Sequence, residues 1–478
     1  MSNTLDLLET NDFPTQGITD SFVTLIDSQT KELVNFVKLS PTPIPSPTID
    51  GVMYLQENTT NQVYKRVYNG VINPEWFGSG KTDAELQTAI NAAVDNDTII
   101  IRGLYRCAHQ IIINKPLTLL GQNYINGNDT GYENSRIYFG DFEDTLATAC
   151  IESNNNLNIK NLVVVGSNIE GKIGLKLNNV SLTLDSVTIQ SFETGVEVTG
   201  GYYNKFVNSA IVYCPTCLVL NNCYNTNATS LSVSAGYESG DTNTKGIVLN
   251  DGSNLNMFGG SIEGFSESGI NLSASRASFY GTYFEGIYDE VNINSCITVE
   301  DDHCRVNAVN CHVYLAFGKA NTFVYIPSTV TSAHIHSKNN YFEYEPVSDW
   351  YTSVYRFAAT DFTSYSIDIS GDNYKNDLVN TGSSYISITS ALLEKGNGIV
   401  QLIYPSGHEL AGIHLTNLNT ISPYQYNDDI LKLQNGTITT FRNNGGLDDD
   451  PLHLHFGSYG YNPYTVIMEN GEWKKIPN

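Results

Sequence analysis

Two glutamates occupy the same slot of a repeated motif. Glu263 lies in GGSIEGF (259–265) and Glu285 in GTYFEGI (281–287), 22 residues further on. If the two motifs stack as neighbouring strands ~4.8 Å apart, the carboxylates should be roughly 5 to 7 Å apart. Repulsion at that distance raises the pKa of one carboxyl group and leaves the other ionised. That is the division between acid and base or nucleophile that glycoside hydrolysis requires.

More acids and aromatic residues surround this pair. Two long repeat steps insert GYESGDTNTK (236–245) before the motifs and IYDE (287–290) after them, which predicts the rims of a groove. The further candidate acids are Glu238, Asp241, Asp289 and Glu290, and the candidate sugar-binding residues are Tyr237, Phe265, Tyr280, Tyr283, Tyr288 and Arg276. Glu343 in YFEY repeats the glutamate slot, which favours the alternative that these acids are solvated surface positions.

Other chemistries have weaker support. A polyuronate lyase needs a basic residue at the sugar C5 and cations around the uronate. Between Leu231 and His303 the only basic side chains are Lys245 and Arg276, which argues against a lyase and against a strongly anionic glycan. No cofactor is predicted. No metal site is predicted either: Glu300 to Asp302 beside His303 favour a solvated turn, and Cys214 with Cys217 favour a structural role. His334 with His336 and His453 with His455 each place two imidazoles on one strand face, and a metal at the last pair is the weaker alternative.

The elements that position the glutamates repeat every 22 to 25 residues from Asn156. A second register places Gly174, Gly195, Cys217, Gly246, Gly269 and Cys296 at equivalent positions. Apolar residues alternate within each unit, as Leu182 and Leu184 do, which indicates strands. A period of this length is typical of a solenoid. The fold class is therefore all-β: a right-handed parallel β-helix of about three short strands per coil, continuing to about residue 400.

One helix precedes the repeat. Thr82 and Glu85 form a capping box, and Leu86, Ala89, Ile90 and Ala93 make one apolar stripe. We expect this helix to cover the open end of the solenoid, whose strand edges would otherwise be unpaired.

The run from Pro74 to Cys107, PEWFGSGKTDAELQTAINAAVDNDTIIIRGLYRC, resembles the entry module of the pectate-lyase-like β-helix tailspikes of bacteriophages. The resemblance covers residues 50–400 at the level of architecture, and no catalytic signature of that family matches residue by residue. It implies a homotrimer on the phage tail of a virion, assembled in the host cytoplasm. It also implies binding, and often cleavage, of a bacterial surface polysaccharide such as capsule, O-antigen or exopolysaccharide.

The flanks suggest three domains. Residues 1–70 are predicted to be a segment that attaches to phage baseplate or tail proteins, followed by a hairpin around NTTN (58–61), with residues 1–49 too polar to build a core of their own. Residues 71–400 form the β-helix. Residues 401–478 contain two Asn-Gly hairpins and are predicted to be a small β domain for trimerisation or carbohydrate binding.

Composition excludes some functions. Fifty acidic residues against 25 Lys and Arg give a net charge of -25, which repels nucleic acid and anionic membrane surfaces. No apolar run approaches the ~20 residues of a membrane span, and the eight irregularly spaced Cys are expected to be reduced and mostly buried. Two hypotheses remain: an endo-glycosidase that depolymerises a polysaccharide, and a non-catalytic receptor-binding or structural tail protein.

Overall fold

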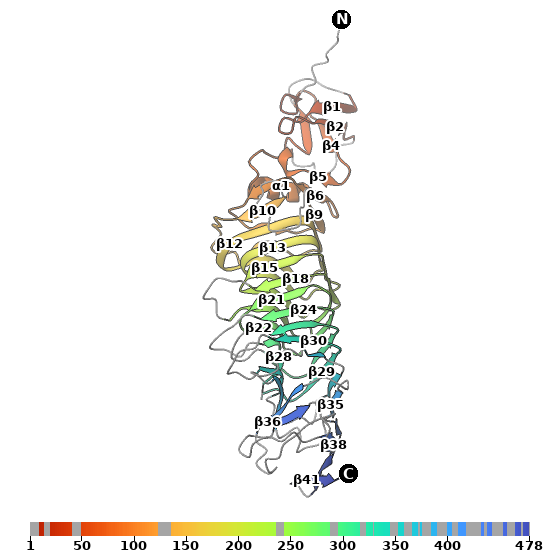
Figure 1. Cartoon of the computed structure of the whole chain (residues 1–478). Helices are drawn as coiled ribbons and strands as arrows, with labels where there is room; N and C mark the ends of the chain where they lie inside the picture. Colours follow the sequence, from red (N-terminus) through yellow and green to blue (C-terminus); the bar gives the residue numbers. More distant parts are fainter. Residues whose placement is uncertain are drawn as a thin grey trace. The chain divides into compact units, whose positions relative to one another are not determined.

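The computed structural model is mostly β and contains a parallel β-solenoid with a short helix near the N-terminus, which confirms the predicted fold class. It describes residues 9–13, 20–40, 49–122, 135–235, 243–286, 295–315, 322–327 and 329–344, without the side chains of 168–170 and 344, and the backbone of separate strands beyond residue 344. The chain divides into two compact units, residues 1–167 and 168–478. Figure 1 shows the strands of each unit.

Unit 1 begins with a four-stranded antiparallel sheet in the order β1-β2-β4-β3. Its strands are β1 (Phe22–Ile26), β2 (Leu33–Lys38), β3 (Tyr54–Glu57) and β4 (Gln62–Val67). The hairpin predicted around NTTN is confirmed, since β3 and β4 pair from Tyr54 with Lys65 to Glu57 with Gln62.

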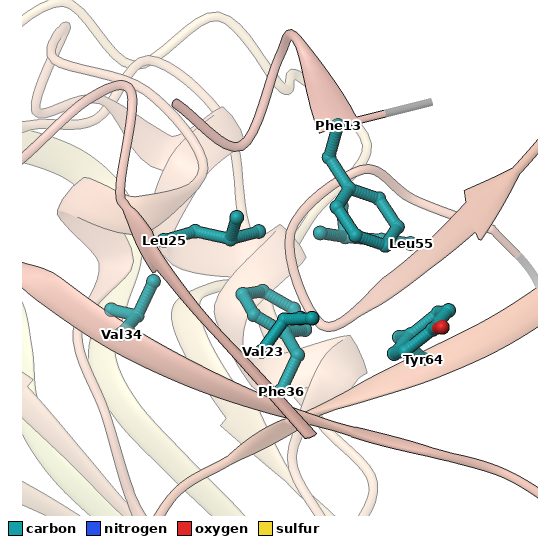
Figure 2. Packing of buried hydrophobic residues seen from close by; sticks show 7 residues of the cluster. All are labelled: Phe13, Val23, Leu25, Val34, Phe36, Leu55 and Tyr64. Atoms are coloured by element: carbon teal, nitrogen blue, oxygen red, sulfur yellow. The ribbon is translucent and has the colours of Figure 1, made fainter. Parts of the chain in front are cut away.

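Residues 1–49, predicted to be too polar for a core of their own, share a buried core with the hairpin of β3 and β4. Figure 2 shows a buried cluster to which β1 and β2 contribute four apolar side chains. Its members are Phe13, Val23, Leu25, Val34, Phe36, Leu55 and Tyr64. The period-two alternation within FVTLI and LVNFVK places these side chains on one face, which the polar character of the surrounding segment concealed.

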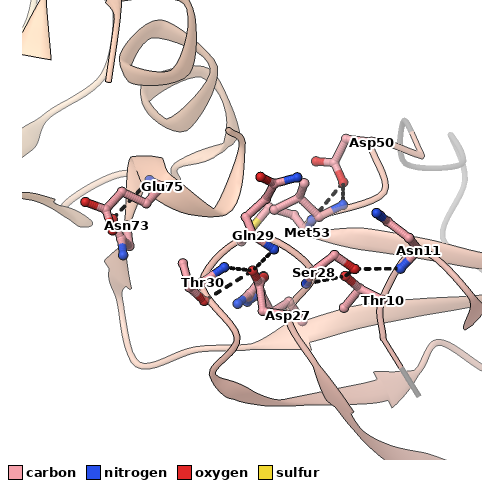
Figure 3. A network of polar contacts seen from close by, with 12 residues as sticks. Thr10, Asn11, Asp27, Ser28, Gln29, Thr30, Asp50, Met53, Asn73 and Glu75 are labelled. Carbon is pink, nitrogen blue, oxygen red and sulfur yellow. Dashed lines mark hydrogen bonds and ion pairs between the residues drawn. The ribbon is translucent and has the colours of Figure 1, made fainter. Parts of the chain in front are cut away.

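Buried polar contacts join this sheet to the PEWFG segment that follows it. Asp27 accepts hydrogen bonds from the backbone N–H groups of Gln29 and Thr30 (Figure 3). Its other oxygen pairs with Arg66 at 2.7 Å, and both side chains are buried. The Arg66 guanidinium in turn lies 3.8 Å from the ring centroid of Trp76. The Trp of this motif therefore holds a buried cation by a cation–π contact.

The rest of unit 1 starts the solenoid. Its elements are β5 (Val71–Ile72), the 3₁₀ turn η2 (Pro74–Trp76), α1 (Asp83–Ala92), β6 (Thr98–Ile101), β7 (Leu104–Arg106), β8 (Ile111–Ile113), β9 (Leu117–Gly121), β10 (Arg136–Phe139), β11 (Ala149–Ser153) and β12 (Leu157–Asn178). Within the unit, β6 pairs with β9, β7 with β10 and β8 with β11, all parallel.

Helix α1 covers an open strand edge, as predicted. The capping box of Thr82 and Glu85 is present, and Leu86, Ala89 and Ile90 are buried. The Gln87 side chain accepts from the Ile112 N–H at 2.8 Å and donates to the Ile112 carbonyl at 2.9 Å. Since the described strands pair β8 on one side only, with β11, the Gln87 amide replaces a missing strand partner.

Unit 2 continues with short strands in regular succession. They are β13 (Leu182–Thr199), β14 (Lys205–Val207), β15 (Ala210–Cys214), β16 (Thr216–Asn221), β17 (Thr226–Thr229), β18 (Ser232–Ala235), β19 (Lys245–Asn250), β20 (Asn254–Phe258), β21 (Ser261–Phe265), β22 (Ser268–Leu272), β23 (Arg276–Tyr280), β24 (Tyr283–Gly286), β25 (Ser295–Val299), β26 (Cys304–Val309), β27 (His312–Leu315), β28 (Thr322–Ile326), β29 (Ala333–Lys338) and β30 (Tyr341–Tyr344).

From β16 onward each strand pairs in parallel with the third strand after it. This arrangement makes three parallel sheets, and each coil contributes one strand to each sheet. The positions predicted to be equivalent in the second register do stack, because a Cβ on Gly246 would lie 2.4 Å from the Gly269 carbonyl oxygen. Small residues recur there because successive backbones approach closely.

The backbone beyond residue 344 changes its pairing. The strands are β31 (Thr352–Phe357), β32 (Ser366–Ser370), β33 (Asn373–Tyr374), β34 (Ser384–Thr389), β35 (Ile399–Ile403), β36 (Leu410–Thr416), β37 (Lys432–Gln434), β38 (Thr437–Phe441), β39 (His453–Phe456), β40 (Tyr464–Glu469) and β41 (Glu472–Pro477). Parallel pairing extends to β34 with β36, and antiparallel hairpins join β37 to β38 and β40 to β41. The predicted Asn-Gly turns, at residues 435–436 and 470–471, lie outside the described residues.

Candidate active site: a carboxylate ladder

The sheet formed by β18, β21, β24, β27 and β30, here called the ladder sheet, carries both candidate glutamates. Glu263 of β21 pairs in register with Glu285 of β24, so the two residues occupy the same position of successive coils (Figure 1 labels the strands). The residues before them, Ile262 and Phe284, are fully buried. Alternation along each strand therefore turns both carboxylates outward, where they are partly exposed.

Tyr283 connects the two glutamates. Its hydroxyl donates a hydrogen bond of 2.7 Å to Oε2 of Glu285. Desolvation, this hydrogen bond and the nearby charges of Glu285 and Glu263 all raise the pKa of Tyr283. Below this raised pKa the phenol is neutral and donates its proton in the hydrogen bond to Glu285.

The next two coils extend the ladder with groups that the sequence analysis did not select. His312 of β27 stands beside Tyr283 of β24, and Tyr341 of β30 stands beside His312. The His312 ring lies edge-on to both tyrosines, at centroid distances of 5.2 and 5.1 Å. Its Nε2 is 3.3 Å from the Glu343 carboxylate. Aligning CHVY with GTYFEG across the insertion would have placed His312 in the slot of Tyr283.

Exposed aromatic rings lie immediately before the ladder sheet. Phe258 ends β20 and Tyr280 ends β23, and their rings stack at 5.1 Å with an interplanar angle of 10°. Their side chains are 46% and 37% exposed, which leaves a flat apolar surface open to a ligand. Gly281, with φ of +64°, makes the corner that leads from Tyr280 to Tyr283. Tyr280 is exposed, and its role in sugar binding stays a prediction; the sequence analysis did not select Phe258.

Two candidate residues lie elsewhere. Phe265 is fully buried, so its prediction as a sugar-binding surface is wrong. The cause is Gly264: its φ of +72° inserts a bulge that shifts the register after Glu263 and turns Phe265 into the core. Arg276 is exposed, but it starts β23, four residues before Tyr280 and away from the glutamates. Tyr237, Glu238, Asp241, Tyr288, Asp289 and Glu290 lie outside the described residues.

The other ligand-like groups have structural partners. The Asp302 carboxylate accepts from the Thr331 and Ser332 N–H groups and the Thr331 hydroxyl, and Glu300 accepts from the Asn271 amide. All eight cysteines are free and buried, as predicted, and burial raises the pKa of Cys217. The described part of the chain has no His, Cys, Asp or Glu cluster able to hold a metal ion. Its helices are also too short and polar to cross a bilayer.

The fold is that of a parallel β-helix protein with outward-facing carboxylates. No family model matches the chain, and no curated protein matches it in sequence. Among solved structures, it is similar to the tailspike protein gp49 of Acinetobacter baumannii bacteriophage Fri1, a capsular polysaccharide depolymerase, with 11% identity and a TM-score of 0.51 over 98% of this chain and 91% of that chain. The gp42 tailspike of Acinetobacter phage vb_AbaP_AS12 has 11% identity and a TM-score of 0.49 over 99% of this chain and 93% of that chain.

Proposed function

We propose that this protein is a phage tailspike that binds a bacterial surface polysaccharide and depolymerises it by glycoside hydrolysis at the ladder sheet. One observation carries the proposal: Glu263 and Glu285 stand in register on adjacent strands, with the Tyr283 hydroxyl bonded to one of them. The fold likeness to the gp49 depolymerase supports the substrate class. The stacked rings of Phe258 and Tyr280 supply a surface on which a sugar ring can lie.

The contacts suggest which glutamate has which role. The hydrogen bond from Tyr283 stabilises Glu285 as a carboxylate, so Glu285 acts as the base or nucleophile. Glu263 acts as the acid, since the described structure gives the Tyr283 hydrogen bond to Glu285 alone. In hydrolysis, Glu263 gives its proton to the departing glycosidic oxygen. Glu285 either activates a water molecule or attacks the anomeric carbon directly.

A second candidate function is sugar binding without cleavage. Exposed stacked rings also occur earlier in unit 2, where Tyr202 and Tyr224 lie 5.4 Å apart. Glu343 repeats the glutamate slot in another coil and pairs with His312. Both features suit a receptor-binding protein that contacts a glycan along several coils.

The decisive experiment measures release of reducing ends from a panel of purified capsules and O-antigens. We expect Glu263→Gln and Glu285→Gln to lose about 10²- to 10⁴-fold in rate while still binding the glycan. Glu343→Gln, which changes the same slot in a later coil, is the matched control and should keep its rate. If all three variants cleave like the wild type, the ladder is not the active site. An ultraviolet-absorbing unsaturated product would indicate a lyase, and binding without any cleavage would favour the second function.

The same proposal includes the assembly. We propose a homotrimer attached through residues 1–70 to baseplate or tail proteins of the virion, with residues 71–400 as the β-helix and residues 401–478 as a domain for trimerisation or sugar binding. We expect sedimentation of the full chain to give three times the mass of one chain. Removal of residues 401–478 should reduce that mass to one chain if this segment trimerises the protein, and a monomeric full chain would contradict the proposal.

A further inference from the structure

The sheet beside the ladder sheet carries an unusual set of outward residues. On β23, β26 and β29 they are Arg276, Ser278 and Tyr280; Arg305, Asn307 and Val309; and His334, His336 and Lys338. We call these nine positions the basic face. Five are Arg, Lys or His and none is acidic, although the chain has 50 acidic residues and only 25 Lys and Arg. If residues were distributed over the surface at random, acidic residues would occur on this face at least as often as basic ones.

Three residues of the basic face, two arginines and one histidine, stand in register on successive strands. Arg276 pairs in register with Arg305, and Arg305 pairs with His334. All three side chains are exposed. Neighbouring strands of a sheet are ~4.8 Å apart, and like charges directly opposite each other are destabilising. The stacking of two guanidinium groups therefore opposes folding instead of supporting it.

The two arginines have no acidic partner among the described side chains, although Asp368 of β32 pairs in register with His336 of β29. Within the described residues, neither Arg276 nor Arg305 forms an ion pair. The acids nearest in sequence are engaged elsewhere: Asp302 binds Thr331 and Ser332, and Asp301 lies 3.4 Å from the Ser273 hydroxyl. Desolvation and the positive charges of Arg305, Arg276 and His303 lower the pKa of His334. The local field is thus positive on a strongly negative protein.

We infer that the basic face binds an acidic polysaccharide, with sugar carboxylates placed on the rungs of Arg276, Arg305 and His334. The planar guanidinium binds a carboxylate through two parallel hydrogen bonds. Tyr280, at the other end of β23, and Phe258 beside it give the same chain of sugars an aromatic surface.

This inference rests on the proposed function and names its substrate class. It also corrects the sequence argument against an anionic glycan. That argument counted the bases between Leu231 and His303 and so excluded Arg305, His334 and Lys338. Parallel pairing brings these later residues into line with Arg276, which the linear sequence does not reveal.

The test is binding, kept separate from cleavage by working with the Glu285→Gln chain. The probes are purified acidic capsular polysaccharides and the same polymers after carboxyl reduction, measured by biolayer interferometry. We expect the double change Arg276→Gln, Arg305→Gln to weaken binding of the native polymer roughly tenfold, with a smaller loss at high salt. Carboxyl reduction of the polymer should weaken its binding to the Glu285→Gln chain to the same extent. It should not change binding to the chain that also carries both arginine changes.

The control for net charge is Lys65→Gln with Lys160→Gln, two changes in unit 1, which should leave binding unchanged. The inference is overturned if no acidic polymer binds, if the arginine changes have no effect, or if carboxyl-reduced polymers bind equally well, as they would through sulfate or phosphate esters. Cleavage of a neutral glycan that depends on Glu263 and Glu285 would then leave the proposed function standing. Conversely, binding that depends on the arginines but is not followed by cleavage would support the inference about the basic face and contradict the proposed hydrolysis.

Thermal unfolding adds a readout that separates binding from structure. Because stacked guanidinium groups repel each other, the protein with both arginine changes should unfold at the same temperature as the wild type at low salt, or at a higher one. A clear decrease would assign the two arginines to the fold and contradict the inference.

Discussion

The ladder sheet and the basic face of unit 2 use the same register in opposite ways. Each repeats like charges on successive rungs, Glu263 with Glu285 on one sheet and Arg276 with Arg305 on the other. Two carboxylates of the ladder sheet have partners within the protein: Tyr283 binds Glu285, and His312 binds Glu343. Neither arginine has an ion-pair partner among the described residues. The ladder sheet thus binds part of its charge within the protein, whereas the basic face leaves charge available to an external anion.

Both faces rest on one interior. Phe279 lies behind the basic face and Phe284 behind the ladder sheet, and their rings meet edge to face at 5.3 Å. Phe284 also contacts Phe323 at 5.6 Å, and all three side chains are fully buried. The spacing of charges on the two surfaces therefore depends on the same aromatic core.

The largest expected effect comes from removing this shared support. Phe284→Ala deletes a fully buried ring and leaves a cavity, so it should lower the free energy of unfolding by about 3–5 kcal/mol. Cleavage at the ladder sheet and binding at the basic face should fall together. Chemical denaturation, rate and binding measurements on one preparation test this expectation.

Ile262→Val is the matched control, because it shortens the inward residue of the neighbouring coil and should cost only about 0.5–1.5 kcal/mol. If Phe284→Ala abolished cleavage but left acidic-glycan binding at the wild-type value, the two faces would not share their support.

The sequence predicts the ladder because one rule, alternation along strands of constant period, sets the facing of Ile262, Glu263, Phe284 and Glu285. The rule fails where the backbone departs from it. Gly264 inserts a bulge, and Phe265 consequently turns inward. A bulge of this kind depends on local φ and on the pairing partner, neither of which follows from residue spacing.

His312 and Arg305 could not be predicted because the sequence does not show which earlier strands they lie beside. His312 and Arg305 follow the insertion after Glu285, so their coil is offset by more than one period from the motifs that define the repeat. Only strand pairing shows that His312 stands beside Tyr283 and that Arg305 stands beside Arg276. The N-terminal core was missed for a different reason. Its two strands belong to an antiparallel sheet outside the repeat, and they bury too few residues each to stand out in a polar segment.

A smaller effect should distinguish the two tyrosines at the corner between the faces. Tyr283→Phe removes the hydrogen bond to Glu285 and should lower the free energy of unfolding by about 1 kcal/mol, with a larger relative loss in cleavage rate than in glycan binding. Tyr280→Phe removes the hydrogen bond that Tyr280 accepts from Asn307 at 2.8 Å, and it keeps the ring that stacks on Phe258. This matched change should leave the cleavage rate within about twofold of the wild type, because a bond between exposed neutral groups contributes less than ~1 kcal/mol.

The role of Tyr283 also predicts how the stability of the protein changes with pH. Because the pKa of Tyr283 is raised in the folded protein, the folded state holds this proton more tightly than the unfolded chain does. The contribution of Tyr283 is therefore fully present below pH ~10, the ordinary tyrosine value, and is lost as the pH rises toward the folded pKa. The stability difference between the wild type and Tyr283→Phe should accordingly be constant from pH 7 to 9 and shrink above pH 10. A difference that instead grew in alkali would mean that ionised Tyr283 is the stabilising form, and the phenol could not be the donor that keeps Glu285 charged.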